Sequence, residues 1–188
     1  MSDCCNTSSD CCESESSKVS HNDHDQHRQR VRDAYAQVAQ ANNSDEACGI
    51  ESSCCGVSDD AAINTLISTR IGYSEEDLTK VPSGADMGLG CGNPRAIASL
   101  KAGEVVVDLG AGGGFDCFLA AHEVGDTGHV IGIDMTPDML SKARNNATKG
   151  NFTNVEFRLG EIEHLPIADD TANVIISNCV INLSPNKP

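Results

Sequence analysis

A glycine-rich turn between two apolar segments holds the residues of this sequence best suited to chemistry. The run Val105–Leu109 passes into a turn in which Gly110, Gly112 and Gly114 alternate with other residues. Glycine lets the backbone approach a ligand closely, and the helix expected next presents free N–H groups there. A second apolar run ends in Asp134, about 20 residues after the glycines, where a carboxylate can bind both hydroxyls of a ribose. These features predict a site for a nucleoside cofactor.

The glycine spacing separates two classes of cofactor. A dinucleotide fold requires Gly-x-Gly-x-x-Gly, and counting from Gly110 the last position is Phe115. The segment instead reads Asp-x-Gly-x-Gly-x-Gly from Asp108, which resembles the first motif of class I methyltransferases that use S-adenosylmethionine. This resemblance implies that Asp108 and Gly110 border the methionine part of the cofactor, with the glycines beneath it. A plain glycine-rich turn is the alternative, and the downstream Asp134 argues against it.

Composition and charge exclude several classes of binding partner. The 188 residues suit one domain plus a tail, and the net charge of −15 disfavours nucleic acid and anionic membranes. Tryptophan is absent, so base-stacking platforms for single strands are not expected. No apolar run has the length of a membrane span, and the first ten residues lack the features of a signal peptide. We therefore expect a cytoplasmic monomer.

The ten cysteines are distributed unevenly. A reducing cytosol disfavours structural disulfides, and no Cys-x-x-Cys pair indicates a zinc knuckle or a thioredoxin-like site. Free thiols instead favour binding of a soft metal or metalloid. Cys117, on the helix after the glycine turn, is better explained as a small buried apolar residue. The cysteines outside the predicted methyltransferase domain are Cys4, Cys5, Cys11, Cys12, Cys48, Cys54 and Cys55.

The chain divides into three parts. Residues 1–26 form a Cys- and His-rich tail that is expected to be disordered, residues 27–70 carry helices and a Cys-bearing linker, and residues 71–188 form the cofactor domain. His21, His24 and His27 recur every third residue, which permits a metal site but is more typical of an exposed polar stretch. The periodicity predicts helices over 27–40, 59–70, 73–80, 94–100, 116–124 and 137–149, and strands over 105–109, 129–134, 155–159 and 174–178. This alternation implies an α/β fold with a parallel sheet covered by helices on both faces and the ligand at the carboxyl edge.

Four segments resemble one branch of the methyltransferases, the arsenite methyltransferases. They begin at Tyr73, Gly88, Gly132 and Ile176, and read YSEEDL, GLGCGNP, GIDMT and ISNCVINL. The resemblance implies a class I methyltransferase fold and transfer of methyl groups from S-adenosylmethionine to arsenite or methylarsenite, with help from a thiol reductant of the thioredoxin or glutathione type.

The resemblance also implies the arsenic ligands. Cys91 matches the cysteine of the Gly-Cys-Gly loop, and Cys179 matches the one after the fourth strand. A third ligand lies further upstream, where Cys48 competes with the pair Cys54 and Cys55. Thiolates leave the arsenic lone pair free to attack an electrophilic methyl group, so catalysis is mainly alignment and needs no general base.

On the cofactor side, the resemblance implies that Asp134 binds the ribose and that Met135 packs on the adenine. Glu161 matches the region of the adenine edge, with a solvated loop carboxylate as the alternative. Asn178 would lie beneath the methionine part, although a cap at the strand end explains it nearly as well.

Two rival functions remain. A thiol-rich arsenic-binding protein would need the cysteines but no nucleoside site, and an ordinary small-molecule methyltransferase would not need Cys91 together with Cys179. We further expect the domain to be incomplete after the fourth strand, which would leave Val174–Ile176 at an edge of the sheet and place the activity of these 188 residues in doubt.

Overall fold

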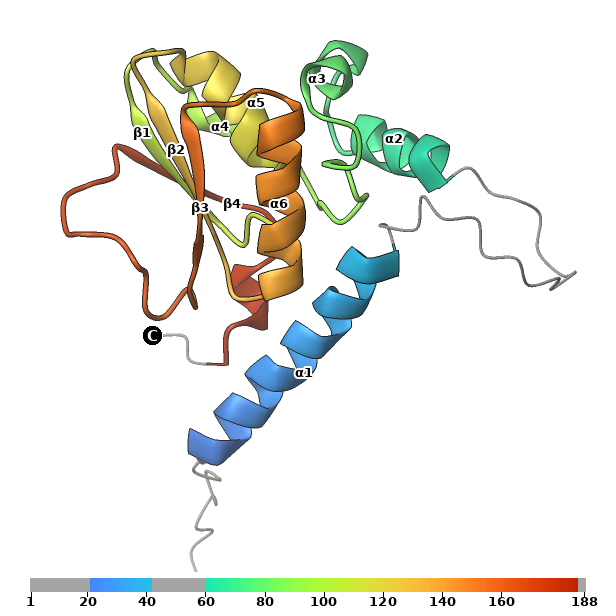
Figure 1. The fold of residues 1–188 in the computed structure, drawn as a ribbon, viewed down its shortest axis with the longest axis vertical. Coiled ribbons are helices and arrows are strands. Elements are labelled where there is room, and N and C mark those ends of the chain that lie inside the picture. Colours follow the sequence, from blue (N-terminus) through green and yellow to red (C-terminus); the bar gives the residue numbers. More distant parts are fainter. Residues whose placement is uncertain (1–20, 42–59, 186–188) are drawn as a thin grey trace, which may run out of the picture.

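The computed structural model describes residues 21–41 and 60–185, and the fold is that of these two ranges (Figure 1). Most elements lie within one or two residues of the predicted ones. In chain order they are α1 (His21–Ala41), α2 (Asp60–Arg70), α3 (Glu75–Lys80), α4 (Arg95–Ala98), β1 (Val105–Leu109), α5 (Phe115–Val124), β2 (His129–Asp134), α6 (Pro137–Lys149), β3 (Val155–Leu159), β4 (Val174–Ser177) and a 3-10 turn (Ile181–Leu183).

The four described strands form one parallel sheet in the order β3-β2-β1-β4. The chain moves outward from β1 to β2 and β3, and β4 then returns to the other side of β1. Val106 therefore pairs with Val130 on one side and with Val174 on the other. The carboxyl ends of β1 and β4 flank the point where the direction of winding reverses, which is where open parallel sheets bind ligands.

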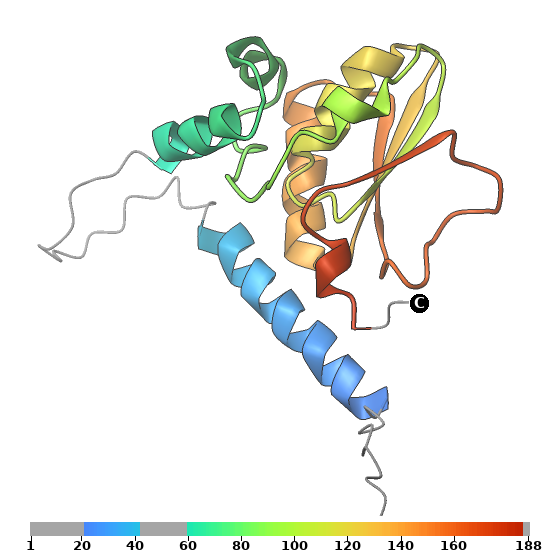
Figure 2. The same ribbon diagram turned by 180° about the vertical axis from the view of Figure 1, so that it is seen from behind.

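One face of the sheet carries the main core. Val106, Val130 and Ile176 pack there against Phe118 and Leu140 of α5 and α6. Figure 2 shows these helices side by side on the same face of the strands. This confirms a class I methyltransferase type of sheet with packed helices.

The opposite face is covered differently from the prediction. Helices were predicted on both faces, but among the described residues the segment between β3 and β4, for which no helix was predicted, lies against Val107 and Ile131 through Leu165 and Ile167. Ile175 of β4 points to this side and is 56% exposed. Strand β4 is one of the two edges of the described sheet, because it pairs with β1 alone.

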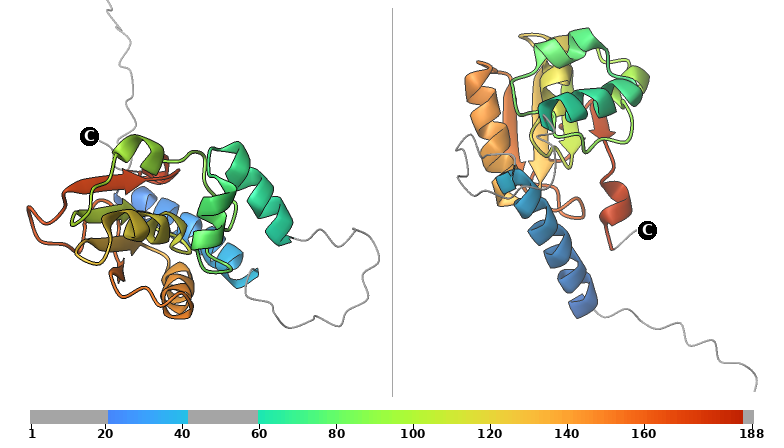
Figure 3. Two further views of the ribbon diagram at one scale, coloured as in Figure 1. Left: turned by 90° about the horizontal axis from the view of Figure 1, so that it is seen from above. Right: turned by 90° about the vertical axis from the view of Figure 1, so that its right-hand side faces the viewer.

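Helix α1 starts earlier than predicted. It begins at His21, so residues 21–26, which the sequence assigned to the tail, belong to a helix. Its carboxyl half docks on α6, where Ala39 packs with Met87 and Met139. Figure 3 shows α1 as a long helix that reaches across one end of the domain, separate from the α5–α6 layer. Packing of this half of α1 against α6 stabilises the helix, and its local sequence alone does not predict this contact.

Two helix starts follow from local sequence. Ser74 caps α3 by accepting the Asp77 N–H at 3.1 Å, while the Asp77 carboxylate accepts the Ser74 N–H at 3.0 Å. This reciprocal capping box satisfies two N–H groups that the first turn leaves free. Pro137 occupies the first turn of α6, where the missing proline N–H costs nothing.

Candidate functional site

A pocket lies at the carboxyl ends of the strands, beside the reversal between β1 and β4. The glycine turn forms its floor, the start of α5 one wall, and Arg28, Val31 and Tyr35 of α1 contribute from the other side. The pocket collects most of the residues predicted from sequence for the cofactor, which are Asp108, Gly110, Gly112, Asp134, Met135 and Asn178.

Within the turn, Gly112 is the residue that faces open space. Its φ is +52°, and a Cβ built there meets no atom within 4 Å. By contrast, a Cβ on Gly110 would overlap the side chain of Val180, and one on Gly114 would lie 2.7 Å from the Phe118 ring. Gly110 and Gly114 thus serve close packing, whereas Gly112 leaves room in the pocket for a bound group.

Asp134 ties the turn to the end of β2. Its Oδ2 accepts the Gly112 N–H at 2.9 Å, and its Oδ1 accepts the Thr136 N–H at 2.8 Å. Burial raises the pKa of Asp134, and these backbone hydrogen bonds oppose that shift by stabilising the charged form. Asp134 also lines the pocket, beside Met135 and Gly112.

Two further carboxylates line the pocket. Burial, together with the charge of Asp116, raises the pKa of Asp108 to about 8, although the Cys117 thiol donates to it at 3.2 Å. Burial likewise raises the pKa of Asp116. A cationic ligand would offset the cost of these buried charges, and S-adenosylmethionine carries a sulfonium and an ammonium group.

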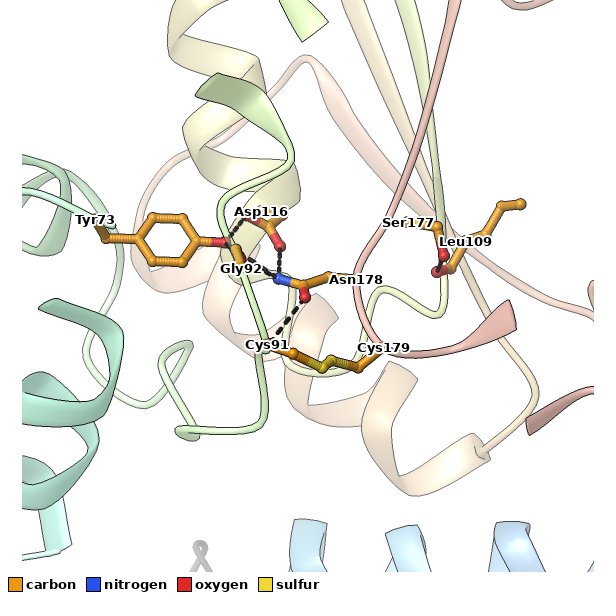
Figure 4. The surroundings of a disulfide bond; sticks show 8 residues. All are labelled: Tyr73, Cys91, Gly92, Leu109, Asp116, Ser177, Asn178 and Cys179. Carbon is orange, nitrogen blue, oxygen red and sulfur yellow. Dashed lines mark hydrogen bonds between the residues drawn. A yellow bond between two sulfur atoms is a disulfide. The ribbon is translucent and has the colours of Figure 1, made fainter. Parts of the chain in front are cut away.

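The two predicted arsenic ligands meet beside the pocket. Cys91, on the loop before α4, and Cys179, two residues after β4, are 88 residues apart in sequence and 5.9 Å apart at Cα. They are joined as a disulfide, whereas free thiolates were expected (Figure 4). Cys179 has a φ of +59° and is among the residues that line the pocket. The third expected ligand, Cys48, and the competing Cys54 and Cys55 lie outside the described residues.

A polar network that the sequence did not reveal surrounds this pair. Tyr73, Asp116 and Asn178 are hydrogen-bonded to one another and to the backbone of the Cys91 loop (Figure 4). Tyr73 is 3% exposed and Asp116 7% exposed. In the sequence, the one local indication of this network was the position of Asp116 at the start of the helix after the glycine turn.

Glu161 takes a different position from the one predicted. It does not line the pocket, and its carboxylate pairs with Arg28 at 3.3 Å and with Arg32 at 3.3 Å. Its neighbours Gly160 and Ile162 are in the lining instead. Arg28, whose side chain is 9% exposed, also pairs with Glu163 at 3.8 Å and thereby fastens α1 over the pocket.

Other candidate sites are not supported. Within residues 21–41 and 60–185, no group of three or more His, Cys, Asp or Glu side chains could hold a metal ion, and His27 instead contacts the Leu183 carbonyl at 3.0 Å. Cys117 is fully buried, and burial raises the pKa of its thiol, which agrees with its interpretation as a packed apolar residue. In the same ranges, no helix combines the length and apolar character needed to cross a bilayer.

Comparisons with known proteins agree with this geometry. Residues 100–188 match the family model of a methyltransferase domain. The chain is 51% identical over 176 residues to an arsenite methyltransferase of Halobacterium salinarum, covering 90% of this chain and 44% of that protein. It is 46% identical over 105 residues to an arsenite methyltransferase of Aquipseudomonas alcaligenes, covering 52% and 30%.

Among solved structures, an arsenic(III) S-adenosylmethionine methyltransferase from Chlamydomonas reinhardtii is 35% identical. The match has a TM-score of 0.45 and covers 68% of this chain and 42% of that one. The chain spans less than half the length of these relatives. The chain is therefore a homologue of the arsenite methyltransferases and has the class I methyltransferase fold.

Proposed function

We propose that this chain binds S-adenosylmethionine in the pocket and directs its methyl group to trivalent arsenic held by cysteine thiolates. The observation that carries the proposal is the meeting of Cys91 and Cys179 at the edge of a pocket lined by Asp108 and Asp134. A thiol-binding protein would need only the cysteines, and an ordinary methyltransferase only the pocket.

The residues of the pocket fit the cofactor. Gly112 leaves space beside the backbone, and we assign the ribose hydroxyls to Asp134 and the adenine to Met135, both of which line the pocket. Asp108 faces the pocket with a carboxylate suited to the cationic methionine part, and Asn178 lies on the same side. When bound, S-adenosylmethionine supplies an electrophilic methyl group.

The cysteines must be reduced before they can bind arsenic. Two electrons and two protons from two equivalents of a thiol reductant convert the Cys91–Cys179 disulfide into two thiols, with a new disulfide formed in the reductant. Each thiol then replaces one hydroxyl of arsenite and releases one water. A third thiol, which we assign to Cys48, completes the coordination.

The chain's contribution to methyl transfer is alignment. Cys179 holds the arsenic from the end of β4, and the glycine turn holds the cofactor at the end of the neighbouring β1. Orientation of two bound reactants supplies a large part of a rate enhancement, and the arsenic lone pair needs no base to remove a proton. We assign to Arg28 of α1, which lines the pocket and pairs with Glu161, the role of keeping water away from the two reactants.

The remaining assignments belong to the same proposal. The methyltransferase domain occupies residues 71–188, the chain acts as a monomer, and its reductant is of the thioredoxin or glutathione type in the cytoplasm. A reducing compartment follows from the chemistry, because the arsenic ligands act only as free thiols.

The test combines binding and transfer on the full chain. After reduction, calorimetry should show S-adenosylmethionine binding, X-ray absorption should show three sulfur neighbours around arsenic, and labelled methyl should move to arsenic. Cys91→Ser should weaken arsenite binding, while Cys4→Ser, in a segment without a proposed role, should leave it intact. Equal arsenite affinity in Cys91→Ser and Cys179→Ser would favour a thiol-rich binding protein instead.

A further inference from the structure

The side chain of Asn178 connects the two segments that carry the paired cysteines. Its Oδ1 accepts the backbone N–H of Cys91 at 3.0 Å, and its Nδ2 donates to the Gly92 carbonyl at 2.8 Å. Asn178 directly precedes Cys179 in the chain. One amide therefore holds the backbone on both sides of the Cys91 side chain and places it opposite Cys179.

This hold depends on which way the amide is turned, and Asp116 reinforces the orientation that the Cys91 N–H and the Gly92 carbonyl require. The Asp116 Oδ2 lies 3.1 Å from Asn178 Nδ2. A carboxylate only accepts hydrogen bonds, so the NH₂ side of the amide must face it and the oxygen must face the Cys91 N–H. In the reversed amide, an N–H would face the N–H of Cys91 and an oxygen would face the Gly92 carbonyl.

Tyr73 in turn fixes the carboxylate. Its hydroxyl lies 2.6 Å from Asp116 Oδ1 and 3.0 Å from the Gly92 carbonyl, and its single proton serves the nearer, charged oxygen. The ring is buried edge-on against Phe115 at 4.8 Å between centroids, which leaves the hydroxyl little freedom. Three separate elements thus converge on the Cys91 loop: the residue before the α3 cap, the first turn of α5 and the end of β4.

We propose that Asp116 and Tyr73 are positioning residues that act through Asn178 to hold the Cys91 and Cys179 thiols as a working pair. The use of this pair as arsenic ligands rests on the proposed function. The pairing itself can be measured without arsenic or cofactor, because two thiols held together form a disulfide more readily than two separate thiols.

The experiment measures the equilibrium of the full chain with reduced and oxidised glutathione. Differential alkylation followed by trypsin and mass spectrometry isolates the pair, because residues 81–95 form a peptide with Cys91 as its one cysteine and residues 159–188 one with Cys179. The variants are Asp116→Asn and Tyr73→Phe, the second of which keeps the buried ring. Asp138→Asn is the matched control, since Asp138 lies in the first turn of α6 and bonds Gln40 instead.

Loss of one buried partner costs about 1–3 kcal/mol, so the equilibrium constant for the pair should fall about fivefold to 150-fold in Asp116→Asn. The equilibrium constant of Tyr73→Phe should also fall, and that of Asp138→Asn should equal the constant of the parent. Melting curves at the assay pH confirm that each variant is folded. A folded Asp116→Asn or Tyr73→Phe with a constant within about twofold of the parent would overturn the proposal. A shifted constant in a chain that binds neither arsenite nor S-adenosylmethionine would retain the positioning role and reject the proposed function.

Discussion

Replacement of Gly112 by alanine separates a role in ligand binding from a role in folding. Gly112 has a φ of +52°, and an added Cβ would meet no protein atom within 4 Å. The methyl group therefore causes no internal clash, and its direct cost is the left-handed backbone, about 1–2 kcal/mol for a residue with a Cβ. For a chain of this size that corresponds to a melting temperature lower by roughly 2–8 °C.

The loss of affinity for the cofactor should be larger than this loss of stability. Gly112 lines the pocket and bonds Asp134, so the new methyl group occupies the space that we assign to S-adenosylmethionine. Overfilling a packed site costs about 1–3 kcal/mol, which predicts an affinity lower by about fivefold to a hundredfold. Calorimetric titration of the reduced chain with S-adenosylmethionine measures it directly.

Gly125→Ala provides the matched control. Gly125 also has open space around it, but it lies at the end of α5, outside the pocket. Its φ of +65° and ψ of −171° fall in a region that only glycine adopts easily, so this variant should lose at least as much stability. Equal cofactor affinities for the two alanine variants would refute the assignment of the space beside Gly112 to the cofactor.

Three further outcomes are expected from stability and exchange measurements. The pKa of Asp108 is raised in the folded state to about 8 from an ordinary 3.8. The free energy of unfolding of the parent should therefore fall as the pH rises from about 4 to 8, and that of Asp108→Asn should fall less. Urea titrations across this pH range measure both. Phe118→Ala empties the centre of the main core and should cost about 3–5 kcal/mol by the same method; a loss under about 1 kcal/mol would contradict the packing described. Arg28→Met leaves the carboxylates of Glu161 and Glu163 without this partner, so amide hydrogen exchange in α1 should become faster. An unchanged exchange rate would show that these ion pairs do not hold the helix.

The sequence was sufficient for features that depend on short stretches of chain. The βα alternation, the glycine turn and Asp134 at the end of β2 each depend on residues within a few positions of one another. Periodicity and turn chemistry are local rules, so these predictions match the structure closely. The start of α1 at His21 was missed because residues 21–26 are all polar and show no apolar periodicity from which a helix could be predicted.

The tertiary structure decided which distant groups meet. Asn178 bonds the Cys91 backbone across 87 positions and Tyr73 across 105, and no spacing rule predicts either contact. Glu161 was expected at the cofactor and instead pairs with Arg28, because the fold brings α1 beside the segment that follows β3. Hydrogen bonds and ion pairs depend on separations of about 3 Å, which arise only when every packed layer between the partners is in place. The residue types thus indicated the chemistry, and the packing of α1, α5 and β4 determined which of them can carry it out together.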